Sequence, residues 1–429
     1  MLKGKFARNI GWIFIGNLVH AVLQFLLNIY VARAFSTDAY GLINYSASLI
    51  TFFSSIGTLG FNGIITKKFA EDEAHSGEYL GTAMLARAAF SLASILFLQI
   101  IVHASNTEEK LLPIIVLCQS ASILFASFDL PIYWFRYKSK AKTVAIIRLI
   151  SFAISAVWRI VVVSLYADIV LYVIGVSLET CLFVVMLFVT YKNQNRGACI
   201  RFSCAKLASM FKISYPFISS AILSTIYGQT DKIMLKSMVD NTAVAIYSVS
   251  LTLAGAIVII PTALIEGFRP DILSFKLANQ TMYIKRLKQL YASVFWICVA
   301  YCIFITVSAK WIILLLYGNK YIDAVPSLSL VVWYTSFSYF GAINNLYMVA
   351  EEKTKWVQLT TLVGAITNVV LNFVLIPIYG VAGAAAASLV TQVFANFILL
   401  LIIPPLRENF FIICDAIMLR GIIKTNKLS

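Results

Sequence analysis

The chain has 429 residues, of which 60% are hydrophobic and 12% are charged, and its formal net charge is +15. A soluble core cannot bury this much apolar surface, so the composition excludes a soluble globular protein and indicates an integral membrane protein. The positive charge does not call for nucleic acid as a partner, because basic loops beside anionic membrane lipids account for it.

Apolar segments recur from the N-terminus to the C-terminus, each long enough to cross a hydrocarbon core of about 30 Å as a helix. We expect twelve transmembrane helices, at residues 9–32, 42–66, 80–103, 111–135, 143–165, 168–190, 213–235, 242–267, 287–308, 322–350, 356–377 and 381–404. The first segment is not expected to be a cleaved signal peptide, because it carries polar residues and begins a repeated unit.

The orientation follows from the lysines and arginines in the loops. Of the 34 basic residues, 25 lie in the terminal segments and in the loops that share their side, whereas 5 lie in the opposite loops. Basic loops stay in the cytoplasm. We therefore expect a multi-pass protein with both termini cytoplasmic.

An internal repeat divides the chain into halves. A shift of 202 residues places residues 42–49 over 244–251 with four identities, and a shift of 213 places 140–142 over 353–355. Both shifts relate equivalent spans in the same orientation, as in transporters built from parallel repeats. The expected fold is an all-α integral membrane protein of two parallel six-helix bundles around a central cavity. Its parts are the N-terminal bundle 1–190, the cytoplasmic linker 191–212, the C-terminal bundle 213–405 and the cytoplasmic tail 406–429.

Three of the expected helices carry polar residues at helical spacing. These polar stripes are Asn17, His20, Gln24 and Asn28 in the first span, Asn44, Ser48, Thr51 and Ser55 in the second, and Ser220, Ser224 and Tyr227 in the seventh. Small polar side chains also hold helices together, which remains the alternative for any single stripe. Because the first and seventh spans are equivalent by the repeat, we expect the stripes to line a cavity for substrate.

Charged residues within the spans are costly, at about 2.5–3.5 kcal/mol each, so they should face the protein interior. The candidates are Arg87, Arg148, Arg159, Lys232, Asp129, Glu179 and Asp231, with Glu266 and Arg269 near a helix end. Asp129 is expected to pair with Arg87 or Arg148, and Glu179 to neutralise a second arginine, whereas Arg159 has no obvious partner at its depth.

The surplus positive charge suggests an anion as ligand. The planar guanidinium of arginine donates paired hydrogen bonds to a diphosphate, so Arg87, Arg148 and Arg159 are candidate substrate-binding residues. Asp231 with Lys232 and Glu266 with Arg269 are candidate ion pairs, with proton transfer as the alternative. His20 is a candidate proton relay or a hydrogen-bonded helix contact.

The sequence motifs do not indicate an enzyme, a nucleotide-binding protein or a metalloprotein. The sequence contains no nucleophile with a matching base, no phosphate-binding glycine-rich loop and no metal-ligand spacing among its seven cysteines and three histidines. We expect no enzyme activity, no cofactor and no metal site.

Two stretches resemble a known family. Residues 371–400 contain a helix with an asparagine, an Ile-Pro-x-x-Gly turn, and a Gly-Ala-Ala segment followed by a polar Thr-Gln pair. The residues of this pattern are Asn372, Ile376, Pro377, Gly380, Gly383, Ala384, Ala385, Thr391 and Gln392. Residues 9–17 and 35–46 are similar to the first hairpin of the same family. The chain resembles O-antigen flippases of the Wzx type, in the polysaccharide-exporter family of the multidrug/oligosaccharidyl-lipid/polysaccharide superfamily.

This resemblance implies movement of undecaprenyl-diphosphate-linked oligosaccharide across the bacterial inner membrane by alternating access. It implies membrane lipids, an O-antigen polymerase and a chain-length regulator as further partners. A lipid II flippase is an alternative, although such proteins typically have fourteen spans and arginines in the first. A multidrug cation exporter usually has a carboxylate in the first bundle's cavity, which the first span lacks. A scaffold protein of a glycan-assembly complex is the remaining alternative.

Overall fold

The computed structural model describes residues 2–72, 75–105, 109–195 and 200–421. These residues form helices and connecting turns without a β-strand, which confirms the expected all-α class. The chain divides into two compact units, Met1–Gln229 and Thr230–Ser429. Residues 196–199 of the expected linker and 422–429 of the expected tail lie outside the described residues.

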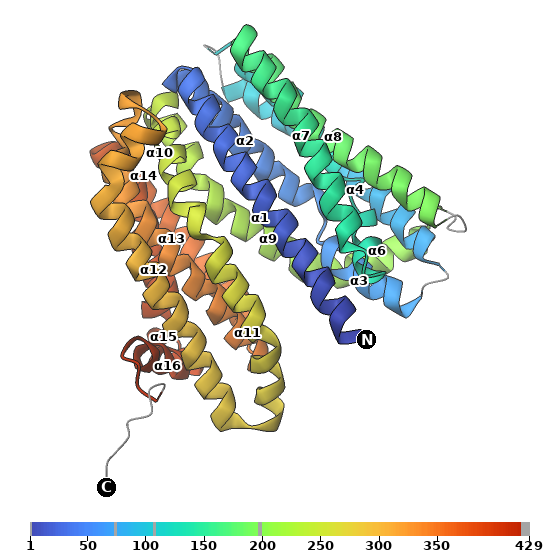
Figure 1. Cartoon of the computed structure of the whole chain (residues 1–429), viewed down its shortest axis with the longest axis vertical. Helices are drawn as coiled ribbons and strands as arrows, with labels where there is room; N and C mark the ends of the chain where they lie inside the picture. The colour runs from blue at the N-terminus through green and yellow to red at the C-terminus, as the bar shows by residue number, and fades with distance from the viewer. Residues whose placement is uncertain (1, 73–74, 106–108, 196–199, 422–429) are drawn as a thin grey trace. The chain divides into compact units, whose positions relative to one another are not determined.

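The N-terminal unit is built from α-helices of different lengths (Figure 1). They are α1 (Leu2–Ala34), α2 (Thr37–Gly57), α3 (Phe61–Glu71), α4 (Ser76–Ser105), α5 (Leu112–Ala126), α6 (Pro131–Tyr137), α7 (Ala141–Leu165), α8 (Ile169–Gln194) and α9 (Cys204–Met238), which continues into the next unit. A core of aromatic and aliphatic side chains, including Phe61, Phe69, Trp134 and Phe135, holds α3, α4, α6 and α8 together.

The C-terminal unit is also built from helices. Its helices are α10 (Asn241–Ala254), η1 (Gly255–Ile257), α11 (Ile259–Ala278), α12 (Gln280–Leu316), η2 (Asn319–Tyr321), α13 (Ala324–Ala350), α14 (Thr354–Val393), the π-helical η3 (Phe394–Ile398), α15 (Leu399–Ile402), η4 (Pro404–Leu406) and α16 (Arg407–Ile417). The pairs α2/α3 and α10/α11, which the repeat makes equivalent, are both bent by 43°.

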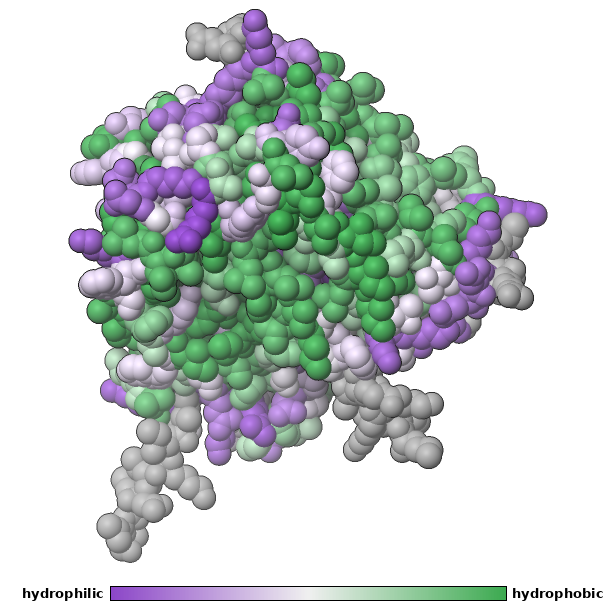
Figure 2. All heavy atoms as spheres, turned by 45° about the horizontal axis from the view of Figure 1, so that its top comes forward, coloured by the Kyte–Doolittle hydropathy of each residue, from purple (hydrophilic) through white to green (hydrophobic). Residues whose placement is uncertain are grey.

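Every expected span lies on a helix or a bent helix pair. Within the described ranges, six helices are long and apolar enough to cross a membrane, and three bent pairs raise this number to nine. The expected spans 213–235 and 322–350 lie on α9 and α13, whose lysines, serines and asparagines lower their hydropathy. The face in Figure 2 shows a broad hydrophobic area with hydrophilic residues toward its edges, as a membrane protein requires.

The helix α14 is a hairpin of two expected spans. Asn368 Nδ2 donates to Ser388 Oγ at 3.1 Å, whereas twenty residues of straight helix span about 30 Å. The chain reverses at Gly380, whose φ of +55° and ψ of −129° suit glycine. The Ile-Pro-x-x-Gly motif therefore forms the turn between the expected spans 356–377 and 381–404.

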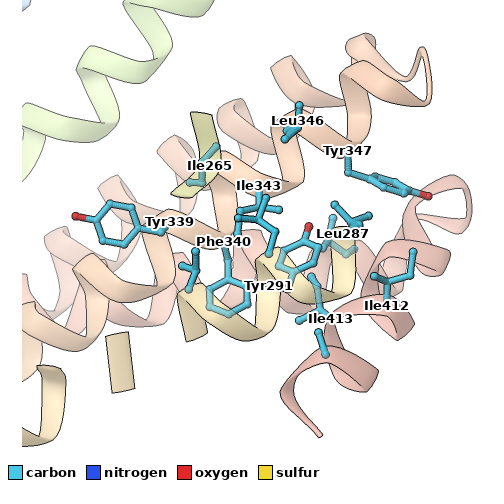
Figure 3. Packing of buried hydrophobic residues seen from close by; sticks show 14 of the residues in the cluster. Ile265, Leu287, Tyr291, Tyr339, Phe340, Ile343, Leu346, Tyr347, Ile412 and Ile413 are labelled. Atoms are coloured by element: carbon cyan, nitrogen blue, oxygen red, sulfur yellow. The ribbon is translucent and has the colours of Figure 1, made fainter. Parts of the chain in front are cut away.

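The helix α16 was not predicted from the sequence. It packs on α12 and α15 through Ile412, Ile413 and Ala416, which belong to the large core cluster in Figure 3. Asn409 is fully buried and its Nδ2 donates to Asn344 Oδ1 at 2.9 Å. The segment after the last span thus contributes to the core of the C-terminal unit.

Candidate functional site

A buried ion pair joins α7 to α8 in the N-terminal unit. Arg159 is 1% exposed, and its Nη2 lies 2.6 Å from Glu179 Oε2. The other carboxylate oxygen of Glu179 lies 3.1 Å from His20 Nε2 on α1. The rings of His20 and Phe152 meet edge to face, and the guanidinium of Arg159 lies over the same phenyl ring. The expectation that Arg159 lacks an acidic partner is therefore wrong.

The surroundings of Arg159 hold its side chain in place. Its Nε donates to the carbonyl of Ser155 at 3.3 Å. A Cβ atom on Gly175 of α8 would lie 2.7 Å from Arg159 Cγ, so the glycine allows the two helices to approach closely. Because α7 and α8 form a hairpin around residues 166–168, Gly175 lies opposite Arg159, and the arginine side chain extends about one helical turn further to Glu179. The signal available in the sequence was that Arg159 and Glu179 lie on the two arms of one hairpin, about one helical turn apart in height.

Arg87 forms an ion pair with Asp129, the other candidate carboxylate of this unit. Its Nη1 donates to Asp129 Oδ1 at 2.9 Å and its Nη2 to the carbonyl of Ala126 at 2.8 Å. Arg87 is 2% exposed, so the pair links α4 to the turn between α5 and α6 inside the protein. Of the two partners expected for Asp129, the structure selects Arg87.

Arg148 is bound by a neutral group. Its Nη1 donates to Asn17 Oδ1 on α1 at 3.2 Å, and its guanidinium lies over the ring of Phe183 at 5.3 Å. In the described part of the chain Arg148 forms no ion pair with a carboxylate. Of the three arginines in the spans of this unit, Arg87 and Arg159 form ion pairs, and Arg148 forms none with the described residues.

The polar stripe of α1 is thus partly engaged by neighbouring side chains. Asn17 is exposed and accepts from Arg148, whereas His20 is half-buried and contacts Glu179. Gln24 Nε2 donates to Asn28 Oδ1 at 3.2 Å, one helical turn away. The stripe therefore presents a line of amides and an imidazole with both donors and acceptors available to hydroxyl groups.

The stripe of α2 is bonded mainly to its own backbone. Ser48 Oγ donates to the carbonyl of Asn44, Thr51 Oγ1 to Ala47 and Ser55 Oγ to Phe52, and Asn44 Nδ2 donates to Tyr40. Ser48 is buried, whereas Thr51 is exposed. The stripe on α9 lies at Ser220, Ser224 and Tyr227, of which Ser224 is exposed and the other two are half-buried.

Asp231 forms the main polar centre of the C-terminal unit. Asn372 Nδ2 donates to Oδ1 at 2.7 Å, Ser388 Oγ donates to Oδ2 at 2.6 Å, and the Tyr247 hydroxyl also donates to Oδ2. Asp231 is 5% exposed. Three donors from α10 and the α14 hairpin compensate the buried carboxylate, as burial of a charge requires.

Lys232 does not pair with Asp231, contrary to one expectation. Within the described ranges Lys232 forms no hydrogen bond or ion pair. Adjacent positions on a helix lie about 100° apart, so Lys232 does not share the face of Asp231 on α9. The other expected pair is confirmed, since Arg269 Nη2 lies 2.7 Å from Glu266 Oε1 on the surface of α11. The described residues contain no group of three or more His, Cys, Asp or Glu side chains that could hold a metal ion.

Comparisons with known proteins agree with this architecture. A family model described as polysaccharide biosynthesis protein matches residues 6–266. The probable flippase AglR of Haloferax volcanii is 24% identical over 428 residues, covering 93% of this chain and 84% of the relative. The lipid II flippase MurJ in an inward closed conformation superimposes with a TM-score of 0.73 at 15% identity, covering 97% of this chain and 93% of MurJ.

A multidrug resistance MATE family transporter in an inward-facing conformation gives a TM-score of 0.70 at 11% identity, covering 92% of this chain and 96% of the transporter. At such low identities these two structures show a shared fold. The all-helical architecture is that of membrane transporters.

Proposed function

The chain belongs to the polysaccharide biosynthesis protein family, and we propose that it is a flippase for undecaprenyl-diphosphate-linked O-antigen repeat units. It is a transporter of the multidrug/oligosaccharidyl-lipid/polysaccharide flippase superfamily and not an enzyme. In the proposal, it works in the bacterial inner membrane with both termini in the cytoplasm. It moves its substrate from the cytoplasmic to the periplasmic leaflet by alternating access.

One observation carries the proposal within this superfamily. The spans of the N-terminal unit hold three arginines, and two of them are neutralised by Asp129 and Glu179. Arg148 forms no ion pair with the described residues, and its guanidinium donates to the amide oxygen of Asn17. A cation without a carboxylate partner favours an anionic substrate such as a lipid diphosphate and disfavours an organic cation.

The polar stripes supply the second part of the proposed site. Amide and hydroxyl groups at Asn17, Gln24, Asn28 and Thr51 have the donors and acceptors that bind sugar hydroxyls. We propose that the glycan passes along these residues while its lipid tail stays in the membrane. The O-antigen polymerase and the chain-length regulator are the proposed protein partners, because they act on the product in the periplasmic leaflet.

Deletion of the gene in its source cell tests the proposal. We expect lipid-linked oligosaccharide to accumulate on the cytoplasmic side and surface glycan to be lost, with recovery when the wild-type gene is returned. The measurement is mass spectrometry of extracted lipid-linked oligosaccharide together with a surface glycan stain.

The alternative functions predict different outcomes of the same deletion. Accumulation of lipid II with cell lysis would instead support a lipid II flippase. Unchanged glycan with increased sensitivity to cationic drugs would support a multidrug exporter. Either result would refute the proposed substrate.

A further inference from the structure

A small cleft opens between α1, α6 and α7 of the N-terminal unit. Its lining residues are Gly16, Asn17, Ile132, Arg136, Ala141, Val144, Ala145 and Arg148. The cleft has about 30 Å³ of space for water-sized groups. This exceeds the need of one water molecule and is far too little for a sugar ring, so the cleft suits the oxygens of a small anion at its mouth.

Two guanidinium groups border this cleft. Arg148 donates to Asn17 Oδ1, while Arg136 lies over the ring of Tyr133 at 5.3 Å. In the described ranges neither arginine forms an ion pair. The nearby carboxylates are already engaged, since Asp129 binds Arg87 and Glu179 binds Arg159. Arg148 is half-buried and Arg136 is exposed. Two positive charges that line the same cleft repel each other and are stabilised when an anion binds there.

The floor of the cleft depends on a close approach of two helices. A Cβ atom on Gly16 would lie 2.7 Å from Ala145 Cβ, so α1 and α7 almost touch there. This approach brings Asn17 within hydrogen-bonding distance of Arg148. The cleft is therefore built by the packing of α1 on α7, and a side chain at position 16 would push the helices apart.

Arg136 directly follows the expected span 111–135 and is one of the 25 basic residues on the expected cytoplasmic side. It lies near the end of α6, just before the turn to α7, and Arg148 lies two helical turns into α7. In the proposed orientation this is the cytoplasmic end of the unit, where a lipid-linked substrate arrives from its site of synthesis.

We propose that Arg136 and Arg148 form a phosphate-binding subsite that takes the diphosphate of the lipid-linked substrate as it enters from the cytoplasmic leaflet. This inference rests on the proposed function, because that function makes the lipid diphosphate the ligand. Arg159 has no part in the subsite, since Glu179 neutralises it. Arg136 is a binding residue in its own right and not a general attractant for anionic lipid.

The test is a binding measurement on the full-length protein in phosphatidylcholine nanodiscs, with farnesyl diphosphate as the probe. We expect Arg136→Gln and Arg148→Gln each to weaken binding by about tenfold or more, as loss of a charged hydrogen-bond donor does. Arg136→Lys should retain part of the affinity, because the charge survives without the bidentate geometry. Folding is checked by the melting temperature, which both glutamine variants should preserve.

The matched control is Lys138→Gln, which removes one positive charge from the same turn. Lys138 is exposed, as Arg136 is, but it lies over the ring of Tyr137 and does not line the cleft. We expect this variant to bind within about twofold of the wild type, because an exposed charge outside the cleft acts only through screened, long-range attraction. Equal losses in Lys138→Gln and Arg136→Gln would overturn the subsite.

Competition experiments distinguish the sources of phosphate. Farnesyl diphosphate should bind more tightly than farnesyl monophosphate and than inorganic pyrophosphate, and farnesol should not compete. Displacement by phosphatidylglycerol would assign the cleft to lipid headgroups, and equal binding of inorganic pyrophosphate would assign it to free phosphate. Either result would refute the substrate role.

The experiments can refute the phosphate-binding subsite and the proposed function independently of each other. If the arginine variants lose the diphosphate but deletion causes no accumulation of lipid-linked glycan, the subsite stands and the O-antigen function is wrong. If deletion causes accumulation but the variants bind normally, the function stands and the subsite is wrong.

Discussion

Arg159→Ala should destabilise the protein far more than Arg148→Ala, although both arginines lie on α7 and both removals delete one charge. Removal of the Arg159 side chain leaves the carboxylate of Glu179 beside His20 without its strongest partner. Loss of one member of a buried ion pair costs about 3–5 kcal/mol. Removal of Arg148 loses one hydrogen bond to an exposed amide and the contact with the Phe183 ring, which together are worth about 2 kcal/mol.

The measurement is thermal unfolding of detergent-purified protein, in which size-exclusion chromatography gives the fraction that stays folded after heating. The double variant Arg159→Met, Glu179→Leu provides the control, because two apolar side chains of similar size leave no charge unpaired and should recover much of the loss. Equal melting temperatures for Arg159→Ala and Arg148→Ala would contradict the assignment of Arg159 to structure and of Arg148 to substrate.

Gly383→Ala is expected to disrupt the α14 hairpin. A Cβ atom at this position would lie 2.2 Å from the carbonyl oxygen of Leu375 and 2.7 Å from its carbonyl carbon. Because both are backbone atoms, the hairpin must open to accept the methyl group. We expect a loss of more than about 3 kcal/mol, beyond the usual range for overpacking. The same opening should separate Asn372 and Ser388 from Asp231, so transport should be lost with the fold.

Gly267→Ala is the matched control for this substitution. Gly267 lies exposed in α11, and an added Cβ would have no neighbour within 4 Å. Alanine is the better helix former by about 1 kcal/mol, so this variant should keep or slightly raise the melting temperature. The hairpin account would be wrong if the two alanine variants unfolded at the same temperature. Folded protein is measured by fluorescence-detected chromatography of a tagged protein.

The sequence predicted the helices because hydropathy and length are local properties. Each expected span lies on a helix or a bent pair, and the glycine of the Ile-Pro-x-x-Gly motif marks the reversal at Gly380. The bends within three spans were not predicted. They lie at short interruptions such as residues 58–60, where Leu59 and Gly60 adopt positive φ, and an apolar run does not reveal such turns.

Partners of the charged residues were harder to predict, because they depend on how each helix is rotated against its neighbours. Asp231 and Lys232 are adjacent in the chain, yet neighbouring residues on a helix point about 100° apart. Asp231 faces Asn372 and Ser388 from the α14 hairpin, more than a hundred residues away. No spacing in the sequence links these positions.

Helical periodicity also did not show whether a polar stripe lines a cavity, contacts other helices or bonds to its own backbone. The α2 stripe has the spacing of a cavity lining, but its side chains donate to carbonyls of their own helix. The α1 stripe has the same kind of spacing and instead contacts Arg148 and Glu179. A helical repeat of polar residues shows which face they share, whereas the packing decides what that face meets.

The most direct test of the account is a translocation assay in proteoliposomes that contain the purified protein and a lipid-diphosphate-linked oligosaccharide with a fluorescent glycan. A membrane-impermeant quencher reports how fast the glycan moves between leaflets. We predict rapid movement with the wild type, slow movement with Arg148→Gln at unchanged melting temperature, and wild-type movement with Lys138→Gln. A wild-type rate equal to that of protein-free liposomes would contradict the claim that this chain moves lipid-linked glycans.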